Sequence, residues 1–149
     1  MHYTVEIDID LPRDRVIELF DSTENLKKWQ RGLQTFEHLE GEPGQAGAKA
    51  HMVFRMGKRK FEIDETITER DLPDGLTCTY DAKGVHNIVK NRFVEVTPDK
   101  TRWTAEHEFV FSGFMKIVGF LAKSAFPKQS MKYMRDFKAF AEDGIDVNA

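Results

Sequence analysis

Two ionisable residues interrupt the apolar faces of segments that otherwise alternate like β-strands. Glu65 lies between two isoleucines, and His107 lies two residues before Phe109. Residues two apart share a face of a strand, so both groups are predicted to lie on an apolar face. A charge buried without a partner is costly, and such groups are therefore either paired or functional. If they converge on one substrate, a carboxyl and an imidazole can act as general base and general acid.

Three further polar residues, Tyr80, Asn87 and Asn91, fall on inward faces by the same count. A β-bulge would shift the register and turn some of these side chains to solvent, and the pattern leaves that alternative open. Alternation is imperfect over residues 33–41, where no face is assigned, and the register over 85–96 is also left open.

Other reactive residue types show no pattern of a known site. The five histidines have neither helical i,i+4 spacing nor matching carboxylates, so no metal site is predicted. The glycines between residues 41 and 47 lead into a strand rather than a helix, unlike a dinucleotide-binding loop. Cys78 is the single cysteine, which excludes an internal disulfide, and its place in an alternating segment predicts a buried thiol. We predict no cofactor.

Composition favours one domain over residues 1–149. Of these residues, 40% are hydrophobic and 32% charged, which suits a sizeable single core. No uncharged apolar run reaches the ~18 residues of a membrane span, and the acidic, alternating N-terminus is unlike a signal peptide, which predicts a cytoplasmic protein. The net charge of −3 argues against nucleic acid as the main partner.

Most of the chain is predicted to form strands separated by turns. Residues 2–10 alternate and predict the first strand. Two short helices are predicted next, over LPRDRVIELFD and TENLKKWQR, with Pro12 suited to a first helical turn. From about residue 33 to 111, Gly, Pro and Asp turns bound six more strands. Their short connections predict antiparallel neighbours in a meander.

Residues 112–143 predict one long helix in two halves, because apolar residues recur there near the 3.6-residue period. Ser112 is expected to cap its start and Gly144 to end it. Pro127 predicts a bend or break near Ala125–Phe126. A twisted seven-stranded sheet cannot lie flat on such a rod, so we expect an α+β fold in which a curved sheet wraps the helix and leaves a cavity.

Three stretches, IDLPRDRVIELFDSTENLKKW, LEGEPGQAGAKAHMVF and TPDKTRW, precede this helix. In that order they resemble the START-like, or SRPBCC, superfamily, which includes the Bet v 1-like and polyketide cyclase/dehydrase groups. The resemblance covers essentially the whole chain and implies a helix-grip fold. It also implies a hydrophobic or amphipathic small molecule held between sheet and helix, in proteins that range from catalysts to carriers to partner-binding modules.

The expected cavity wall consists of the inward residues of several elements. They are Phe54, Ile63, Tyr80, Asn91, Trp103, Phe109, Leu121 and Met134, with Glu65 and His107 marking the polar end. Our first interpretation is a binding protein for an aromatic, lipid-like or polyketide-like molecule. The alternative is a cyclase or dehydrase that uses Glu65 and His107 as acid and base.

A third function is left open by the final helix, which carries six basic residues against three acidic ones. Its basic face fits a protein-interaction module with an acidic partner. The wide apolar content of Phe114–Phe126 fits contact with a membrane surface. The sequence does not decide between enzyme and carrier, and it specifies no oligomeric state.

Overall fold

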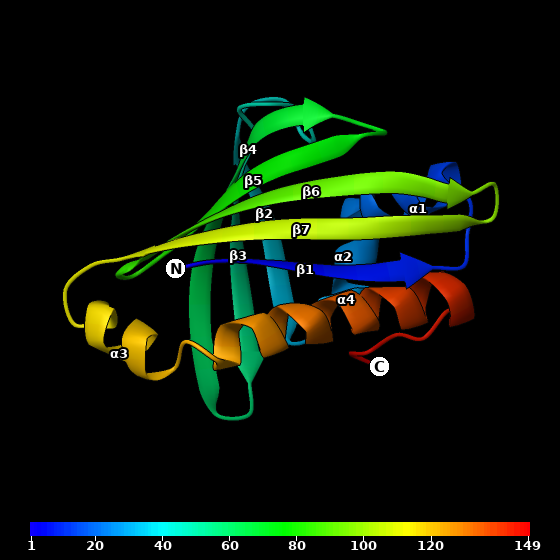
Figure 1. Ribbon diagram of the computed structural model, residues 1–149. Coiled ribbons are helices and arrows are strands. Elements are labelled where there is room, and N and C mark those ends of the chain that lie inside the picture. The colour runs from blue at the N-terminus through cyan, green and yellow to red at the C-terminus, as the bar shows by residue number, and fades with distance from the viewer.

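The computed structural model describes residues 1–149 and follows the predicted order of elements (Figure 1). The strands are β1 (His2–Ile9), β2 (Leu33–Glu40), β3 (Lys49–Met56), β4 (Arg59–Asp71), β5 (Gly75–Ala82), β6 (Val85–Thr97) and β7 (Lys100–Phe111). The helices are α1 (Arg13–Phe20), the 3₁₀ turn η1 (Thr23–Asn25), α2 (Leu26–Trp29), α3 (Met115–Leu121) and α4 (Ala125–Asp143).

All seven strands form one antiparallel sheet in the order β1-β7-β6-β5-β4-β3-β2. Because β1 and β2 are the two edges, the segment carrying α1 and α2 crosses from one edge to the other. The sheet curls over α4, which runs along its concave side (Figure 1). These features confirm the predicted helix-grip architecture.

The core lies where α4 meets the sheet and the short helices. Phe137 of α4 is fully buried, and its ring centroid lies 5.0 Å from that of Trp29 and 5.4 Å from that of Trp103. Phe20 of α1 joins this aromatic cluster at 5.7 Å from Phe137. Burying one such side chain contributes roughly 1.5–3 kcal/mol. The cluster therefore fixes one end of α4 against the sheet and α2.

The long C-terminal helix is interrupted, as predicted, but just before the predicted place. α3 ends at Leu121 and α4 begins at Ala125, so Pro127 lies in the first turn of α4, where its missing N–H breaks no helical hydrogen bond. Gly144 ends α4 with a left-handed φ of 68°, as expected. The predicted cap is wrong, because Phe114 precedes α3 and no side chain caps that helix.

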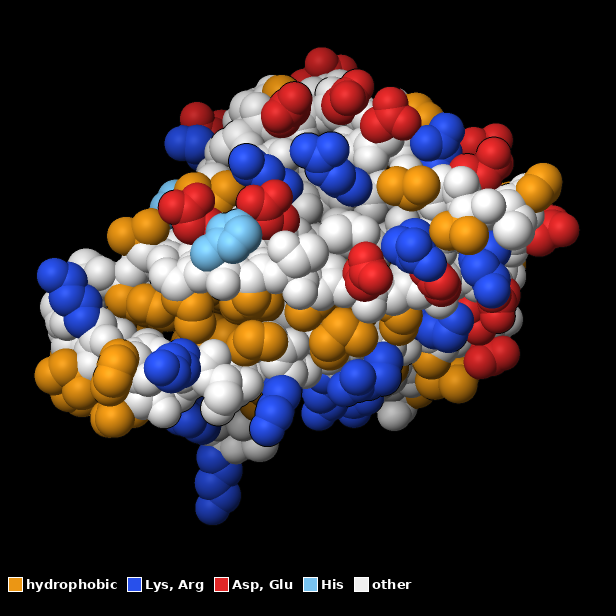
Figure 2. Space-filling view, in the orientation of Figure 1, with side chains coloured by type: hydrophobic (Ala, Val, Ile, Leu, Met, Phe, Trp, Pro, Cys, Tyr) orange, Lys and Arg blue, Asp and Glu red, His pale blue; other side chains and the backbone are white.

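Charge is unevenly distributed over the surface. In Figure 2, acidic side chains gather on the upper side of the molecule, whereas basic ones gather on the lower side near α3 and α4. Among the helices, none combines the length and the apolar character that crossing a membrane requires.

Candidate ligand-binding cavity

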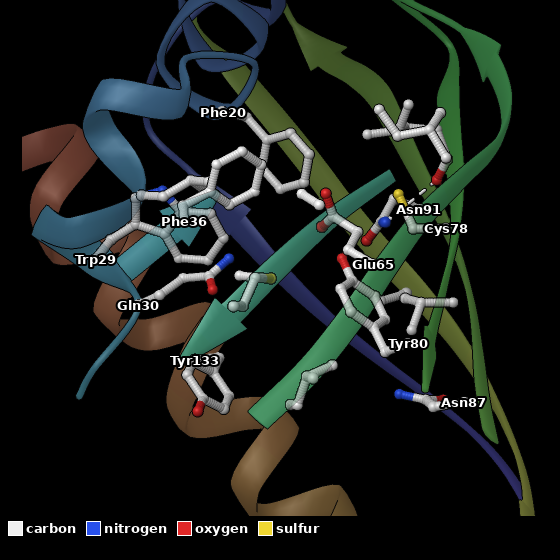
Figure 3. Close-up of a pocket in the computed structure, with 18 of the residues that line it drawn as sticks. Phe20, Trp29, Gln30, Phe36, Glu65, Cys78, Tyr80, Asn87, Asn91 and Tyr133 are labelled. Carbon is white, nitrogen blue, oxygen red and sulfur yellow. Dashed lines mark hydrogen bonds between the residues drawn. The ribbon is translucent and has the colours of Figure 1, made fainter. Parts of the chain in front are cut away.

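A cavity of about 560 Å³ lies between the concave face of the sheet and α4 (Figure 3). Its volume falls within the roughly 300–1,000 Å³ typical of ligand pockets. Hydrophobic side chains make up 21 of its 35 lining residues. A molecule inside it would therefore meet mainly apolar surface, with a few polar groups to orient it.

Nine of the ten residues expected at the site line this cavity. They are Phe54, Ile63, Glu65, Tyr80, Asn91, Trp103, His107, Phe109 and Met134. The alternation of side chains along each strand explains this result, because each of the sheet residues lies on the concave face. Whether these residues bind a ligand stays a prediction.

Leu121 does not reach the cavity and corrects the expected wall. Its side chain is 76% exposed at the end of α3. The apolar period runs on through residues 122–124, but the backbone leaves the helix there, so α3 and α4 do not share one face. Counting helical positions as if α3 and α4 were one continuous helix therefore places Leu121 on the wrong face.

Glu65 and Tyr80 form the polar centre of the cavity. They are register partners on β4 and β5, and their polar groups lie close together in the cavity (Figure 3). Burial raises the pKa of Glu65, and the nearby Tyr80 hydroxyl opposes that rise. Burial and the neighbouring carboxylate together raise the pKa of Tyr80 well above its usual value. Both shifts favour the protonated, neutral form of each group.

Cys78 lies beside this pair and is buried, as predicted. Burial, followed by the charge of Glu65, raises the pKa of its thiol far above the usual value. A thiol in that state is a poor nucleophile, so Cys78 acts as apolar wall.

His107 occupies a separate part of the cavity. Two strands, β5 and β6, lie between the strand of Glu65 and that of His107. The His107 ring stacks on Tyr3 with centroids 4.9 Å apart, and Asn87 Nδ2 donates to its Nδ1 at 3.5 Å. Burial alone lowers the pKa of His107 to about 4, so the ring is neutral at pH 7. It is therefore not the imidazolium partner of Glu65 that a coupled acid–base pair would need.

Comparison with known proteins identifies the family. Residues 1–142 match the model of the family described as polyketide cyclase / dehydrase and lipid transport. The chain belongs to this family. No curated protein sequence matches it closely enough to count as a relative.

Several solved structures share this fold over nearly the whole length of the chain. It superimposes with a TM-score of 0.81 on the ZhuI aromatase/cyclase from Streptomyces sp. R1128, at 13% identity over 95% of this chain and 93% of that one. A norcoclaurine synthase point mutant from Thalictrum flavum, solved with a transition state analogue, gives 0.73 at 11% identity, covering 97% and 95%. The protein Ara h 8.0201 gives 0.74 at 12% identity, covering 95% and 97%. At these identities the likeness shows the fold.

Hydrogen bonds within the protein determine which polar groups of the cavity wall are free to bind a ligand. Trp103 Nε1 donates to Asn91 Oδ1 at 2.9 Å, and Asn91 Nδ2 donates to the Leu76 carbonyl at 3.2 Å. Asn91 and Trp103 therefore hold each other in the wall. Asn87 differs, because its Oδ1 is buried without any partner. Since such an atom costs free energy when unsatisfied, Asn87 is a candidate acceptor for a ligand donor.

Several lining residues were not found by sequence reasoning. They come from the edges and helices of the fold, namely Tyr3, Phe20, Trp29, Gln30, Phe36, Gln129, Ser130 and Tyr133. Phe20 and Trp29 could have been found, because each belongs to a predicted helix with an apolar stripe. Tyr3 could also have been found, because it lies on the alternating first strand. The others depend on how α2, β2 and α4 approach one another, which no local pattern encodes.

Proposed function

We propose that this protein binds a neutral, mostly apolar aromatic molecule whose hydroxyl or carbonyl group hydrogen-bonds to Glu65 and Tyr80. The observation that carries the proposal is a carboxyl–phenol pair at the centre of an apolar cavity. In a poorly solvated cavity, such a pair can both donate to and accept from one ligand group.

The charges of the lining argue against an anionic ligand. Lys49 is the single lysine or arginine among the lining residues, and its Nζ lies 3.9 Å from a Glu40 carboxylate oxygen. A carboxylate ligand at the centre would meet Glu65 without a compensating cation, which is costly at low polarity. A neutral polycyclic phenol or ketone carries no such cost.

The test is a matched series of three probes, 1-naphthol, 1-methylnaphthalene and 1-naphthoate. Both tryptophans, Trp29 and Trp103, line the cavity, so quenching of their fluorescence reports binding. Naphthol should bind about tenfold more tightly than methylnaphthalene, because one satisfied hydrogen bond contributes roughly 1 kcal/mol or slightly more. Naphthoate should bind least.

Two variants test whether the preference for naphthol depends on the polar pair. Tyr80→Phe keeps the ring but should weaken the preference for naphthol, whereas Tyr133→Phe, elsewhere in the wall, should retain it in full. Equal affinity of the wild type for naphthol and methylnaphthalene would refute the proposal. So would a preference that is undiminished in Tyr80→Phe.

A second candidate, an enzyme that enolises a ketone, is favoured by the raised pKa of Glu65. Its ionised carboxylate would take a proton from the carbon next to a carbonyl while Tyr80 donates to the carbonyl oxygen, and the proton would then return. Because His107 is neutral, it would act here only as a hydrogen-bonding group.

2-Acetylnaphthalene in D₂O separates this enzyme from a carrier. The enzyme should accelerate exchange of the methyl protons, as measured by NMR, and Glu65→Gln should remove that acceleration while retaining binding. If the wild type binds the ketone without accelerating exchange, the enzyme is excluded and the carrier stands.

A further inference from the structure

One exposed apolar surface of the fold takes no part in lining the cavity. Residues of α3, and the residue before it, present large apolar side chains to solvent, each between 57% and 76% exposed: Phe114, Ile117, Phe120 and Leu121. The other side of α3 packs on β7, where Gly119 is buried and an added Cβ would lie 2.6 Å from the Phe111 ring. The close contact of Gly119 with Phe111 therefore keeps the apolar side chains of the opposite face turned to solvent, although their exposure to water is unfavourable.

The stretch of chain that carries this apolar face has charged residues of one sign. The stretch from Phe109 to Arg135 contains no Asp or Glu, and its exposed basic residues are Lys116, Lys123, Lys128, Lys132 and Arg135. These five give the stretch a charge of +5, and because the whole chain carries −3, the remainder carries −8. Figure 2 shows basic groups beside and below the apolar cluster, whereas the upper side carries acidic and basic groups together.

The β3–β4 hairpin adds to this basic side. Lys58, Arg59 and Lys60 are exposed at its tip, which points to the same lower side of the molecule as α3 in Figure 1. A flat anionic surface approaching from that side would meet the apolar residues of α3 and positive charge from two separate elements.

An aromatic path joins α3 to the cavity. Phe111, beneath Gly119, lies 5.6 Å from Phe126 between ring centroids, and Phe126 lies 4.9 Å from Phe109. Both Phe126 and Phe109 line the cavity. An apolar molecule leaving a lipid phase at α3 would therefore find apolar surface along the way inward.

We propose that α3 docks this protein on the surface of an anionic lipid bilayer. The exposed apolar side chains enter the interface, and the surrounding lysines contact anionic headgroups. A second copy of this chain is a poor occupant, because a symmetric contact would bring the two +5 stretches together. Docking would place the cavity beside the phase in which apolar molecules dissolve.

Flotation with phosphatidylcholine vesicles, with and without phosphatidylglycerol, tests the proposal. The wild type should float with the anionic vesicles and remain free with the neutral ones. Replacing Lys116 and Lys123 by Gln should weaken binding about 25-fold, since each juxtamembrane lysine contributes about fivefold. F120S/L121S should abolish flotation, whereas the control V94S/K90Q, exposed on β6, should float like the wild type.

A site-specific label shows whether α3 itself enters the interface. Leu121→Cys carrying a polarity-sensitive dye should shift to shorter emission wavelength with anionic vesicles, and a dye at Val94→Cys should not. Native Cys78 is buried and will not react. Absence of wild-type flotation would overturn the proposal in favour of an acidic protein partner. Equal flotation with neutral vesicles, undiminished flotation of F120S/L121S, or an unshifted dye at residue 121 would also overturn it.

This inference does not depend on the ligand proposed for the cavity. F120S/L121S changes two surface residues outside the lining, so its affinity for 1-naphthol in solution should equal that of the wild type. Conversely, Tyr80→Phe should leave flotation unchanged.

Discussion

The buried position of His107 predicts both the direction and the size of a change in folding stability with pH. Its ring packs against Tyr3, at 4.9 Å, and Phe109, at 6.0 Å, and burial lowers its pKa from the usual 6.5 to about 4. Below pH 6.5 the unfolded chain binds a proton that the folded protein does not. Stability from this group is therefore complete above pH 6.5 and is lost as the pH falls toward 4.

The whole pKa difference corresponds to about 3.4 kcal/mol, at about 1.36 kcal/mol for each pH unit. Between about pH 7.5 and about pH 5, the loss attributable to His107 is about 2 kcal/mol. His107→Phe keeps an aromatic ring in the stack but cannot titrate. On going from the higher to the lower pH, the free energy of unfolding should therefore shift by about 2 kcal/mol in favour of the variant.

Urea unfolding followed by tryptophan fluorescence at the two pH values measures this shift. His51→Gln is a control of opposite sign, because the hydrogen bonds that His51 donates to Asp64 and to Glu62 raise its pKa, so the wild type gains from that group on acidification. A difference between wild type and His107→Phe that stays constant with pH would refute the argument. So would an NMR titration midpoint of His107 near 6.5.

Two further predictions concern the supports of the cavity. Asp136 is buried on α4 and accepts hydrogen bonds from Arg31 Nε at 3.1 Å and Nη2 at 3.0 Å, so Asp136→Ala should cost about 2 kcal/mol in urea unfolding, while exposed Asp143→Ala costs almost nothing. Gly119→Ala should displace α3, because its Cβ would lie 2.6 Å from the Phe111 ring. Amide exchange over residues 115–121 should then accelerate with little change in the unfolding midpoint, and unchanged exchange would contradict the packing.

The sequence was most informative where one face of a strand packs on the core. Alternation predicted the strands because inward residues such as Met52 and Phe54 are buried while their neighbours are not. β2 resisted assignment for a physical reason. Its pairing with β3 shifts register between Leu33 and Thr35 and again between His38 and Glu40, so no single alternation runs through it.

The helix at the C-terminus shows the limit of periodicity. Apolar spacing continues from α3 into α4, although the chain leaves the helix between them. The spacing records which residues are apolar, but the direction of each helix depends on its packing against β7 and the concave sheet. Leu121 was therefore placed with Met134, which lines the cavity, although it belongs to a face turned to solvent.

The polar centre of the cavity was predicted in part, and the missing part changes its chemistry. Glu65 could be placed inward because the β4–β5 register shift begins only after Ile67, beyond the carboxyl. Its partner depends on strand pairing. The pairing places Tyr80 directly opposite, whereas β5 and β6 separate the strand of Glu65 from that of His107.

An imidazolium beside Glu65 would have formed a charged pair and lowered the pKa of the carboxyl. The phenol leaves that pKa raised, and burial keeps His107 neutral. The interior therefore offers hydrogen bonds without a strong field, which favours ligands that are neutral on entry. The basic side around α3 lies outside the cavity, where it can attract an anionic surface without competing for the ligand inside.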